Sequence, residues 1–200
     1  MIEEQYSIQA ETLMKTAVED YQEIIEDIQA ANANMNVLKG IRVTVNGKPR
    51  RLVDIGDLKS GDTEKQLKVL VFNTDHIPLL VEEINNIDFD SSVDGQFITI
   101  DVPDPSYKQL MEVVEDLNRK KNSAVGRLTK AKSEATTRAR TAVENEFIEQ
   151  NVASKASKAC DLHYDTYSAQ INDFTTSKIK DILGEEFYKK YLEEEEFLSS

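Results

Sequence analysis

The stretch LMEVVEDLNRKKNSAVGRLTKAKSEATTRARTA, residues 110–142, repeats apolar residues at alternating steps of four and three. This spacing keeps one apolar stripe on a single helix face. The stripe comprises Leu110, Val114, Leu117, Ala124, Leu128, Ala131, Ala135 and Ala142. A charge occupies the slot at Lys121. The pattern predicts one long helix that packs against other helices.

Two further stretches carry similar spacing. The first includes Ala10, Met14, Ala17, Tyr21, Ile24, Ile28 and Ala31. The other is less regular and includes Cys160, Tyr164, Tyr167, Ile171, Phe174, Ile179 and Leu183, after which Gly184 is expected to end or loosen the helix. Three such faces can bury one another, so we predict a three-helix bundle.

A block rich in glycine, proline and β-branched residues separates the first helix from the second. Alternation over residues 38–45 predicts a strand, and Asn46-Gly47 is a strong hairpin signal. Residues 52–55, 66–72 and 97–102 are interpreted as further strands, and residues 77–84 as a short helix. We therefore expect an α+β fold with two domains, in which residues 1–33 and 104–200 form an antiparallel three-helix bundle and residues 34–103 form an inserted, small, β-rich α+β domain.

Two short connections, near residues 32–36 and 102–106, join the predicted domains. Pro103 and Pro105 stiffen the second connection. Two linkers lying side by side permit a hinge. The hinge residues that we expect are Asn32, Ala33, Asn34, Val102, Pro103, Asp104 and Pro105.

Length and composition exclude several classes of protein. Two hundred residues with 40% hydrophobic content can bury a core without disulfides, and a single cysteine excludes an intramolecular bridge. No apolar run approaches the roughly twenty residues that span a bilayer, and the N-terminus is acidic rather than basic. We therefore expect no membrane partner and see no signal or transit peptide.

Charge is distributed unevenly along the chain, whose net charge is −13. Residues 1–33 hold eight acidic residues and one lysine, whereas residues 119–140 hold eight basic residues and one acidic residue. On a helix, the basic residues Arg119, Lys120, Arg127, Lys130 and Arg138 fall on or beside one line, which we name the basic ridge. The ridge predicts a phosphate-binding surface. The alternative is a solvated helix face that pairs with the acidic first helix.

The sequence contains few residues of the types that act in catalysis. His76 and His163 are the two histidines, and the spacing of Cys160 and His163 suggests a thiol and base pair only weakly, because a bundle seam is a commoner place for a cysteine. No metal-ligand motif and no phosphate-binding glycine loop is present. We expect no enzyme activity, no metal and no cofactor.

The acidic C-terminus, residues 185–198, interleaves glutamates with aromatic residues. It is either a docking tail that folds on a partner or the frayed end of the third helix, and we favour the frayed end.

The order of three short motifs along the chain is informative. They are Val37-Leu38-Lys39-Gly40-Ile41, then residues 67–73 (LKVLVFN), then residues 100–105 (IDVPDP). Their order and spacing resemble the ribosome recycling factor family over nearly the whole chain. The resemblance implies an L-shaped, two-domain monomer that binds large-subunit ribosomal RNA through basic bundle residues. It also implies that an elongation-factor-G-like GTPase acts with it to split post-termination ribosomes into subunits.

The chain departs from the family pattern at the end of its first helix. The family has an R-T-G-R-A-S-P motif whose arginines face ribosomal RNA, whereas this chain has Gln29 and Asn32 at those positions. The text VGRLTKA, residues 125–131, likewise holds fewer arginines than the family's VRNVRRD. We therefore expect a diverged organellar member in the mitochondrial matrix, with its presequence removed; the alternative is the bacterial cytoplasm.

Two other functions stay open at this stage. The first is a ribosome-associated or ribosome-assembly protein that keeps the fold and has lost recycling, as the absent arginines suggest. The second is an adaptor unrelated to RNA, in which the basic ridge only pairs with the acidic helix.

Overall fold

The computed structural model describes residues 2–63 and 65–199 of the chain. These residues fall into two compact units, residues 1–28 with 114–200 (unit 1) and residues 29–113 (unit 2). The predicted domain boundaries near residues 33 and 104 stay a prediction. Among the residues described, no helix combines the length and the apolar character needed to cross a membrane.

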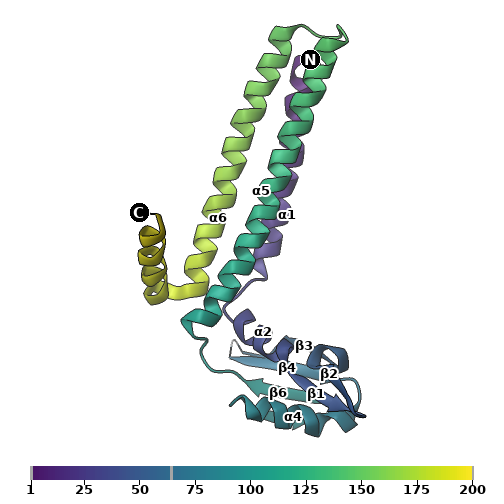
Figure 1. Cartoon of the computed structure of the whole chain (residues 1–200), viewed down its shortest axis with the longest axis vertical. Coiled ribbons are helices and arrows are strands. Elements are labelled where there is room, and N and C mark those ends of the chain that lie inside the picture. Colours follow the sequence, from purple (N-terminus) through teal and green to yellow (C-terminus); the bar gives the residue numbers. More distant parts are fainter. Residues whose placement is uncertain (1, 64, 200) are drawn as a thin grey trace. The chain divides into compact units, whose positions relative to one another are not determined.

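Unit 1 is built from the long helices α1 (Ile2–Glu26), α5 (Tyr107–Glu144, which begins in unit 2) and α6 (Gln150–Ser199), as Figure 1 shows. Contacts of α1 with α5 run in opposite directions along the two helices, from Gln9 with Arg138 to Asp20 with Arg127. Contacts of α1 with α6 run in the same direction, including Tyr21 with Thr175. The helices therefore form the predicted bundle, with α5 antiparallel to α1 and α6.

The predicted apolar stripes form the core of unit 1. All eight stripe residues of α5 are buried. On α1, however, Ile24 is 48% exposed and Ile25 is 5% exposed, so the prediction for Ile24 is wrong. A straight helix drifts relative to a strict heptad repeat, and the buried position moves on by one residue. Helix α1 also ends at Glu26, which leaves both Ile28 and Ala31 of the predicted stripe outside it.

A buried polar contact joins α1 and α6. The Thr175 hydroxyl donates to the Ile171 carbonyl (2.6 Å), so the Tyr21 hydroxyl donates to Thr175 Oγ1 (2.5 Å). Tyr21 is 1% exposed, and burial raises the pKa of its phenol, against a smaller lowering by the bond to Thr175. The hydrogen bond satisfies a hydroxyl that burial would otherwise leave without a partner.

Helix α6 bends sharply at Gly184, whose φ of 67° and ψ of 176° lie outside the helical region. Side chains other than glycine rarely adopt these angles. In Figure 1 the last segment, in dark yellow, turns back from the rest of α6. The C-terminus is therefore helical to Ser199, and the frayed end that we favoured is wrong.

Unit 2 begins with helix α2 (Asn32–Gly40) and the hairpin of β1 (Arg42–Val45) and β2 (Lys48–Arg51). Asn46 and Gly47, with φ of 52° and 72°, form the predicted turn. Residues 38–40 belong to α2 and not to a strand, because Ala33, Asn34 and Leu38 form one buried helical face. The strand predicted over residues 38–45 is therefore limited to β1.

Residues Leu52–Ile55 form the short helix α3, where a strand was predicted. Leu52 and Ile55 are buried three residues apart, and the Arg51 backbone N–H donates to Asp54 Oδ2 (3.1 Å) at the start of the turn. These local contacts override the strand preference of β-branched Val53 and Ile55.

The main sheet is antiparallel in the order β3-β4-β6-β5, formed by β3 (Gly56–Ser60), β4 (Gln66–Val71), β5 (Asp90–Asp94) and β6 (Phe97–Asp101). The predicted strands at β4 and β6 are confirmed, whereas β3 and β5 were not predicted. Helix α4 (Ile77–Asn86) follows the short helix η1 (Thr74–His76) and buries Ile77, Leu80 and Ile84 against the sheet core. The expected α+β class with a β-rich insert between helices is thus confirmed.

Candidate nucleic-acid interface

All five residues of the basic ridge lie on the single helix α5, as predicted, and we call this surface the α5 ridge from here on. Its buried stripe faces the bundle, and the ridge follows one flank of that stripe. Arg119 and Lys130 have the most exposed side chains of the ridge, at 73% and 77%, whereas Lys120 is 38% exposed. The ridge is therefore open to solvent along its length.

Four ridge residues each form an ion pair with an acidic residue of α5. Arg119 lies 3.8 Å from Glu115, and Lys120 lies 3.7 Å from Asp116, each one helical turn away. Exposed pairs of this spacing contribute about 0.3–0.5 kcal/mol each and weaken with salt. A phosphate can replace such partners at little cost.

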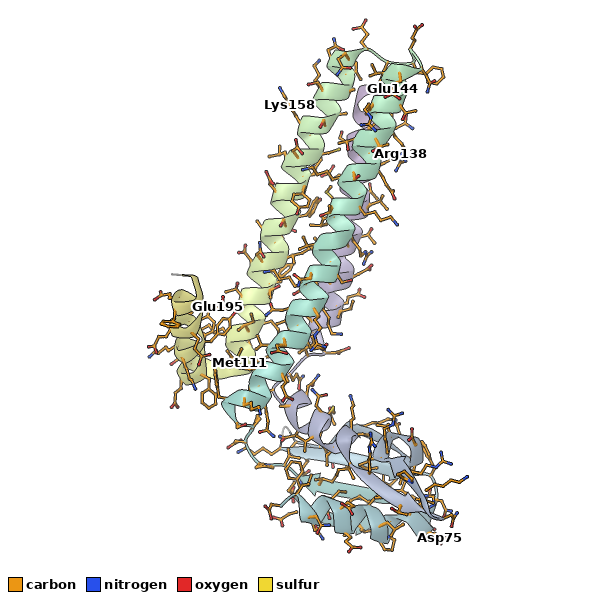
Figure 2. The ribbon with its side chains drawn as sticks, viewed as in Figure 1. Asp75, Met111, Arg138, Glu144, Lys158 and Glu195 are labelled. Atoms are coloured by element: carbon orange, nitrogen blue, oxygen red, sulfur yellow. The ribbon has the colours of Figure 1, made fainter. Side chains whose placement is uncertain are left out.

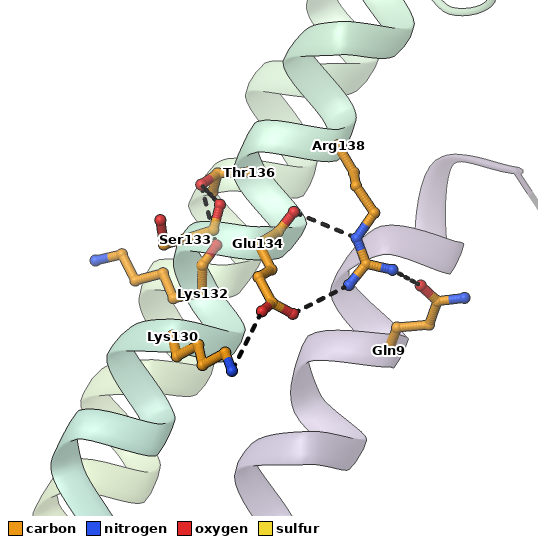
Figure 3. Close-up of polar contacts among 7 residues, drawn as sticks. All are labelled: Gln9, Lys130, Lys132, Ser133, Glu134, Thr136 and Arg138. Atoms are coloured by element: carbon orange, nitrogen blue, oxygen red, sulfur yellow. Dashed lines mark hydrogen bonds and ion pairs between the residues drawn. The ribbon is translucent and has the colours of Figure 1, made fainter.

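Glu134 joins the two remaining residues of this group, as Figure 3 shows. Its carboxylate lies 3.9 Å from Lys130 Nζ and 3.7 Å from Arg138 Nη2. Arg138 Nε also donates to the Glu134 carbonyl (3.3 Å), and Nη1 donates to Gln9 Oε1 on α1 (3.0 Å). Arg138 is thus held toward α1, while Lys130 keeps a largely exposed ammonium.

Arg127 makes the closest ion pair of the ridge, with Asp20 of α1 at 2.7 Å. Both side chains are about half exposed. Among the described side chains, Arg127 alone of the ridge pairs with an acidic residue of α1. Pairing with the acidic helix, the alternative to phosphate binding, therefore accounts for one ridge residue and not for the other four.

Lys132, on the same helix, has a structural role instead. Its ammonium lies 2.7 Å from Asp161 and 4.9 Å from the centre of the Tyr164 ring, both on α6. The hydrogen bond to Asp161 is the main cause that raises the pKa of Lys132. This contact draws Lys132 toward α6 and away from the α5 ridge.

The pair of Cys160 and His163 shows no sign of nucleophilic chemistry. Cys160 is 1% exposed, and burial, aided by the charge of Asp161, raises the pKa of its thiol. His163 Nδ1 faces Glu11 at 3.7 Å. A thiolate is disfavoured at such a site. In the described part of the chain, no group of three or more His, Cys, Asp and Glu side chains is arranged to hold a metal ion.

The predicted hinge residues Asn32, Ala33 and Asn34 lie in the first turn of α2 and not in an irregular linker. The irregular stretch is residues 27–31, because the apolar face that starts α2 begins at Ala33. Asn34 is 2% exposed, and its Nδ2 donates to the Pro103 carbonyl (3.0 Å).

The second predicted connection, residues 102–106, is irregular as expected. The Val102 backbone N–H donates to the Lys65 carbonyl (3.0 Å), and Lys65 Nζ lies 2.8 Å from Asp104. Pro105 starts no helix, since α5 begins at Tyr107. Val102, Pro103 and Asp104 are therefore fastened to unit 2 by backbone, amide and ionic contacts.

Sequence reasoning missed a second group of basic residues, on α2 and the β1–β2 hairpin. It treated residues 38–51 only as a strand and turn. The available signal was charge, because residues 39–51 contain five basic residues and no acidic residue.

Comparison with known proteins identifies the family. A family model described as Ribosome recycling factor matches residues 21–183. The chain is 25% identical over 174 residues to the ribosome-recycling factor of Chlamydia felis, covering 86% of this chain and 94% of that protein. It is 24% identical over 170 residues to the Chlamydia caviae protein of the same name, covering 84% and 92%.

A solved structure titled as the solution structure of the ribosome recycling factor has the same fold. It covers 92% of this chain and 99% of its own, with a TM-score of 0.53 and 22% identity. A helical bundle that carries a β-rich insert is thus the fold that this chain shares with that ribosome recycling factor. The chain belongs to the ribosome recycling factor family, whose members are not enzymes.

Proposed function

We propose that this chain binds the post-termination ribosome and, together with an elongation-factor-G-like GTPase, promotes splitting into subunits. The family match over residues 21–183 carries the proposal, because it spans most of the bundle and all of the insert. The chain supplies no nucleotide-binding loop. The energy of GTP hydrolysis therefore comes from the partner.

The α5 ridge is the proposed contact with large-subunit ribosomal RNA. Each ridge residue already has a carboxylate within 4 Å, and binding exchanges this carboxylate for a phosphate oxygen. The intrahelical pairs are weak enough for that exchange. Arg127 must also leave Asp20, which makes it the residue with the highest cost.

The proposed response to the GTPase is a movement of one unit relative to the other, through bending of the chain at the two connections. The bond from Asn34 to Pro103 ties α2 to residues 102–106 within unit 2. Bending on the N-terminal side is thus expected at residues 27–31, which have no regular structure, rather than at residues 32–34. This places the flexible joint about five residues earlier than the sequence predicts.

The compartment is a further part of the proposal. The absence of the family arginines at Gln29 and Asn32 favours an organellar member in the mitochondrial matrix. The relatives found are bacterial, which favours the alternative, a bacterial cytoplasm. Splitting of mitochondrial but not bacterial ribosomes supports the matrix, and the reverse preference supports the bacterial cytoplasm.

A second function, ribosome association without recycling, is favoured by the same absent arginines and by the carboxylates beside each ridge residue. The two functions differ in one outcome. A recycling factor splits ribosomes when the GTPase and GTP are present. An assembly or association factor binds and leaves the ribosome intact.

The ridge is tested with the double variant Arg119→Gln/Lys130→Gln. Both residues are highly exposed and make weak contacts, so the fold should be unaffected. The matched control is Arg140→Gln/Lys155→Gln, which removes the same charge from exposed positions outside the ridge. We expect the ridge variant to bind purified ribosomes roughly 10-fold more weakly at low salt, with a shallower salt dependence. Equal affinities of the two variants would exclude the ridge as the contact.

A further inference from the structure

Unit 2 carries a concentrated basic surface that the proposed function does not use. It comprises Lys39, Arg42, Lys48, Arg50 and Arg51, which we name the basic hairpin. All five residues are exposed. The segment from residue 39 to residue 51 has no acidic residue, whereas the rest of unit 2 holds four basic and thirteen acidic residues. The positive charge is therefore gathered on α2 and one hairpin of an otherwise acidic unit.

The pairing register brings like charges together. Arg42 lies directly opposite Arg51 on the neighbouring strand. Side chains in directly opposed positions have Cβ atoms about 4.5–5.5 Å apart, and like charges there are destabilising. Lys48 and Arg50, opposite Val45 and Val43, alternate to the other face of the hairpin. The fold thus maintains cations on both sides of this ribbon against their mutual repulsion.

Fewer carboxylates accompany the basic hairpin than accompany the α5 ridge. Arg51 is bound to Asp54 through two contacts of 3.1 Å. Arg42, Lys48 and Arg50 have no ion pair with any side chain that the structure describes. An external anion would both neutralise these cations and relieve the repulsion between the opposed arginines.

The chemistry of the surface favours RNA phosphate over an acidic protein. Protein interfaces depend on buried aromatic or large apolar anchors. Residues 39–51 contain no aromatic residue, and none of the large apolar side chains of this segment is exposed. Guanidinium groups bind phosphate oxygens in a bidentate manner. Without an aromatic ring for base stacking, the contact is with the backbone and independent of sequence.

We propose that the basic hairpin is a second RNA-binding surface, which contacts the phosphate backbone independently of the α5 ridge. The proposal rests on the proposed ribosomal function only for the identity of the RNA. It gives unit 2 an attachment of its own, so that each of the two units contacts RNA. Because Arg42, Lys48 and Arg50 form no ion pair with a described side chain, each phosphate contact is made without first breaking one.

The test compares two triple variants of the full chain. Arg42→Gln/Lys48→Gln/Arg50→Gln removes the unpaired cations of the basic hairpin. Lys155→Gln/Lys158→Gln/Lys180→Gln removes the same charge from exposed positions on α6; Lys158 is labelled in Figure 2. Affinity for a double-helical ribosomal RNA fragment is measured between roughly 50 and 200 mM salt, the range over which phosphate contacts weaken strongly. Circular dichroism verifies that both variants are folded.

We expect the hairpin variant to bind the fragment roughly 10-fold or more weakly than the control at the lowest salt. The slope of log affinity against log salt should fall by about two, since each lost phosphate contact removes roughly 0.7–0.9. Equal affinities and slopes for the two triple variants would overturn the proposal. Loss of binding to polyglutamate with unchanged binding to RNA would also overturn it and indicate an acidic protein partner.

Failure of the proposed function gives a different pattern. If the wild-type chain does not split ribosomes but the hairpin variant still loses RNA affinity against its control, recycling is wrong and the RNA surface stands. If splitting occurs and both triple variants bind RNA alike, recycling stands and the RNA surface is wrong.

Discussion

Arg127 takes part both in bundle packing and in the RNA contact that we propose. Its guanidinium lies 2.7 Å from Asp20, and both side chains are about half exposed. A surface ion pair of this kind contributes up to about 1 kcal/mol. Binding to a phosphate therefore requires α1 to release Arg127, at a cost that lowers ribosome affinity.

Replacing Asp20 tests this competition. Asp20→Asn should raise affinity for ribosomes a few-fold, up to roughly five-fold, because Arg127 no longer has to leave a carboxylate. The matched control is Glu19→Gln, which removes the same charge from the next residue of α1 and breaks only an exposed pair with Lys15 at 3.8 Å. Sedimentation with ribosomes at low salt gives the affinities. Equal gains in both variants would show a general effect of charge and contradict a specific role for Asp20.

We expect the hydroxyl of Tyr21 to contribute to the stability of the folded chain. Tyr21→Phe removes the hydroxyl that donates to Thr175, so the free energy of unfolding should fall by about 0.5–1.5 kcal/mol in a urea titration. Burial raises the pKa of Tyr21 above its ordinary value of 10.0. The folded chain thus holds the phenolic proton more tightly than the unfolded chain, and this contribution is complete below pH 10 and lost as the pH rises further.

The variant Tyr21→Phe should accordingly lose less stability than the wild type between pH 9 and pH 11. Tyr167 also has a pKa raised by burial, so part of the alkaline loss remains in the variant. Identical pH profiles for the two proteins would contradict the assignment of this loss to Tyr21.

At the scale of elements, we expect replacement of glycine by alanine to have opposite effects on stability at Gly184 and at Gly126. Gly184 has a φ of 67° at the bend of α6, where an added Cβ is strained even though no atom lies within 4 Å. Gly184→Ala should lower stability by about 1–3 kcal/mol. Gly126 lies within α5, also with nothing within 4 Å of an added Cβ. Gly126→Ala should raise stability by about 0.8–1 kcal/mol.

Thermal unfolding followed by circular dichroism measures both glycine variants. A gain in stability at Gly184 would show that the helix continues straight through this residue in solution. A loss at Gly126 would show that another side chain packs against the glycine.

Periodic elements could be predicted from the sequence, whereas short elements set by local contacts could not. The stripe of α5 is long enough for its period to be unmistakable, and Asn46-Gly47 has few conformations other than a hairpin turn. Helix α3 spans only Leu52–Ile55, and its start depends on the contact of Arg51 with Asp54. A window of four residues, three of them apolar, cannot distinguish such a turn from a strand.

The positions of the basic residues on the helix could be predicted from the sequence, but the side chains that they contact could not. Helical geometry alone places Arg127 and Arg138 in line on one face. Arg127 pairs with the carboxylate of Asp20, and Arg138 donates to the amide of Gln9. Both partners lie on α1, so these contacts depend on how the bundle packs. The unpaired cations of the basic hairpin likewise follow from the register that sets Arg42 opposite Arg51.

On the scale of the whole molecule, the distribution of charge reconciles a net charge of −13 with a partner made of RNA. Acidic residues dominate α1 and the C-terminal segment after Gly184, while basic residues are gathered on α5 and the β1–β2 hairpin. Acidic surfaces outside these contacts repel RNA phosphate and oppose binding in the wrong orientation. The two proposed basic surfaces would then select where the chain attaches.

The family match covers residues 21–183 and stops one residue before the bend at Gly184. We therefore expect removal of residues 185–200 to leave ribosome association within about two-fold of the full chain, since the α5 ridge and the basic hairpin lie outside that segment. Sedimentation with ribosomes measures the effect, and thermal unfolding verifies that the shortened bundle is intact. A loss of association by a folded, shortened chain would assign the acidic segment a direct role in binding.

The most direct test of the recycling function is splitting of purified post-termination ribosomes, followed by light scattering. The chain is added with an elongation-factor-G-like GTPase and GTP, and each component is omitted in turn. We expect scattering to fall only when all three are present, and we expect Arg119→Gln/Lys130→Gln to slow the fall relative to Arg140→Gln/Lys155→Gln. Unchanged scattering with the complete mixture, together with retained binding to ribosomes, would contradict recycling and leave ribosome association as the function.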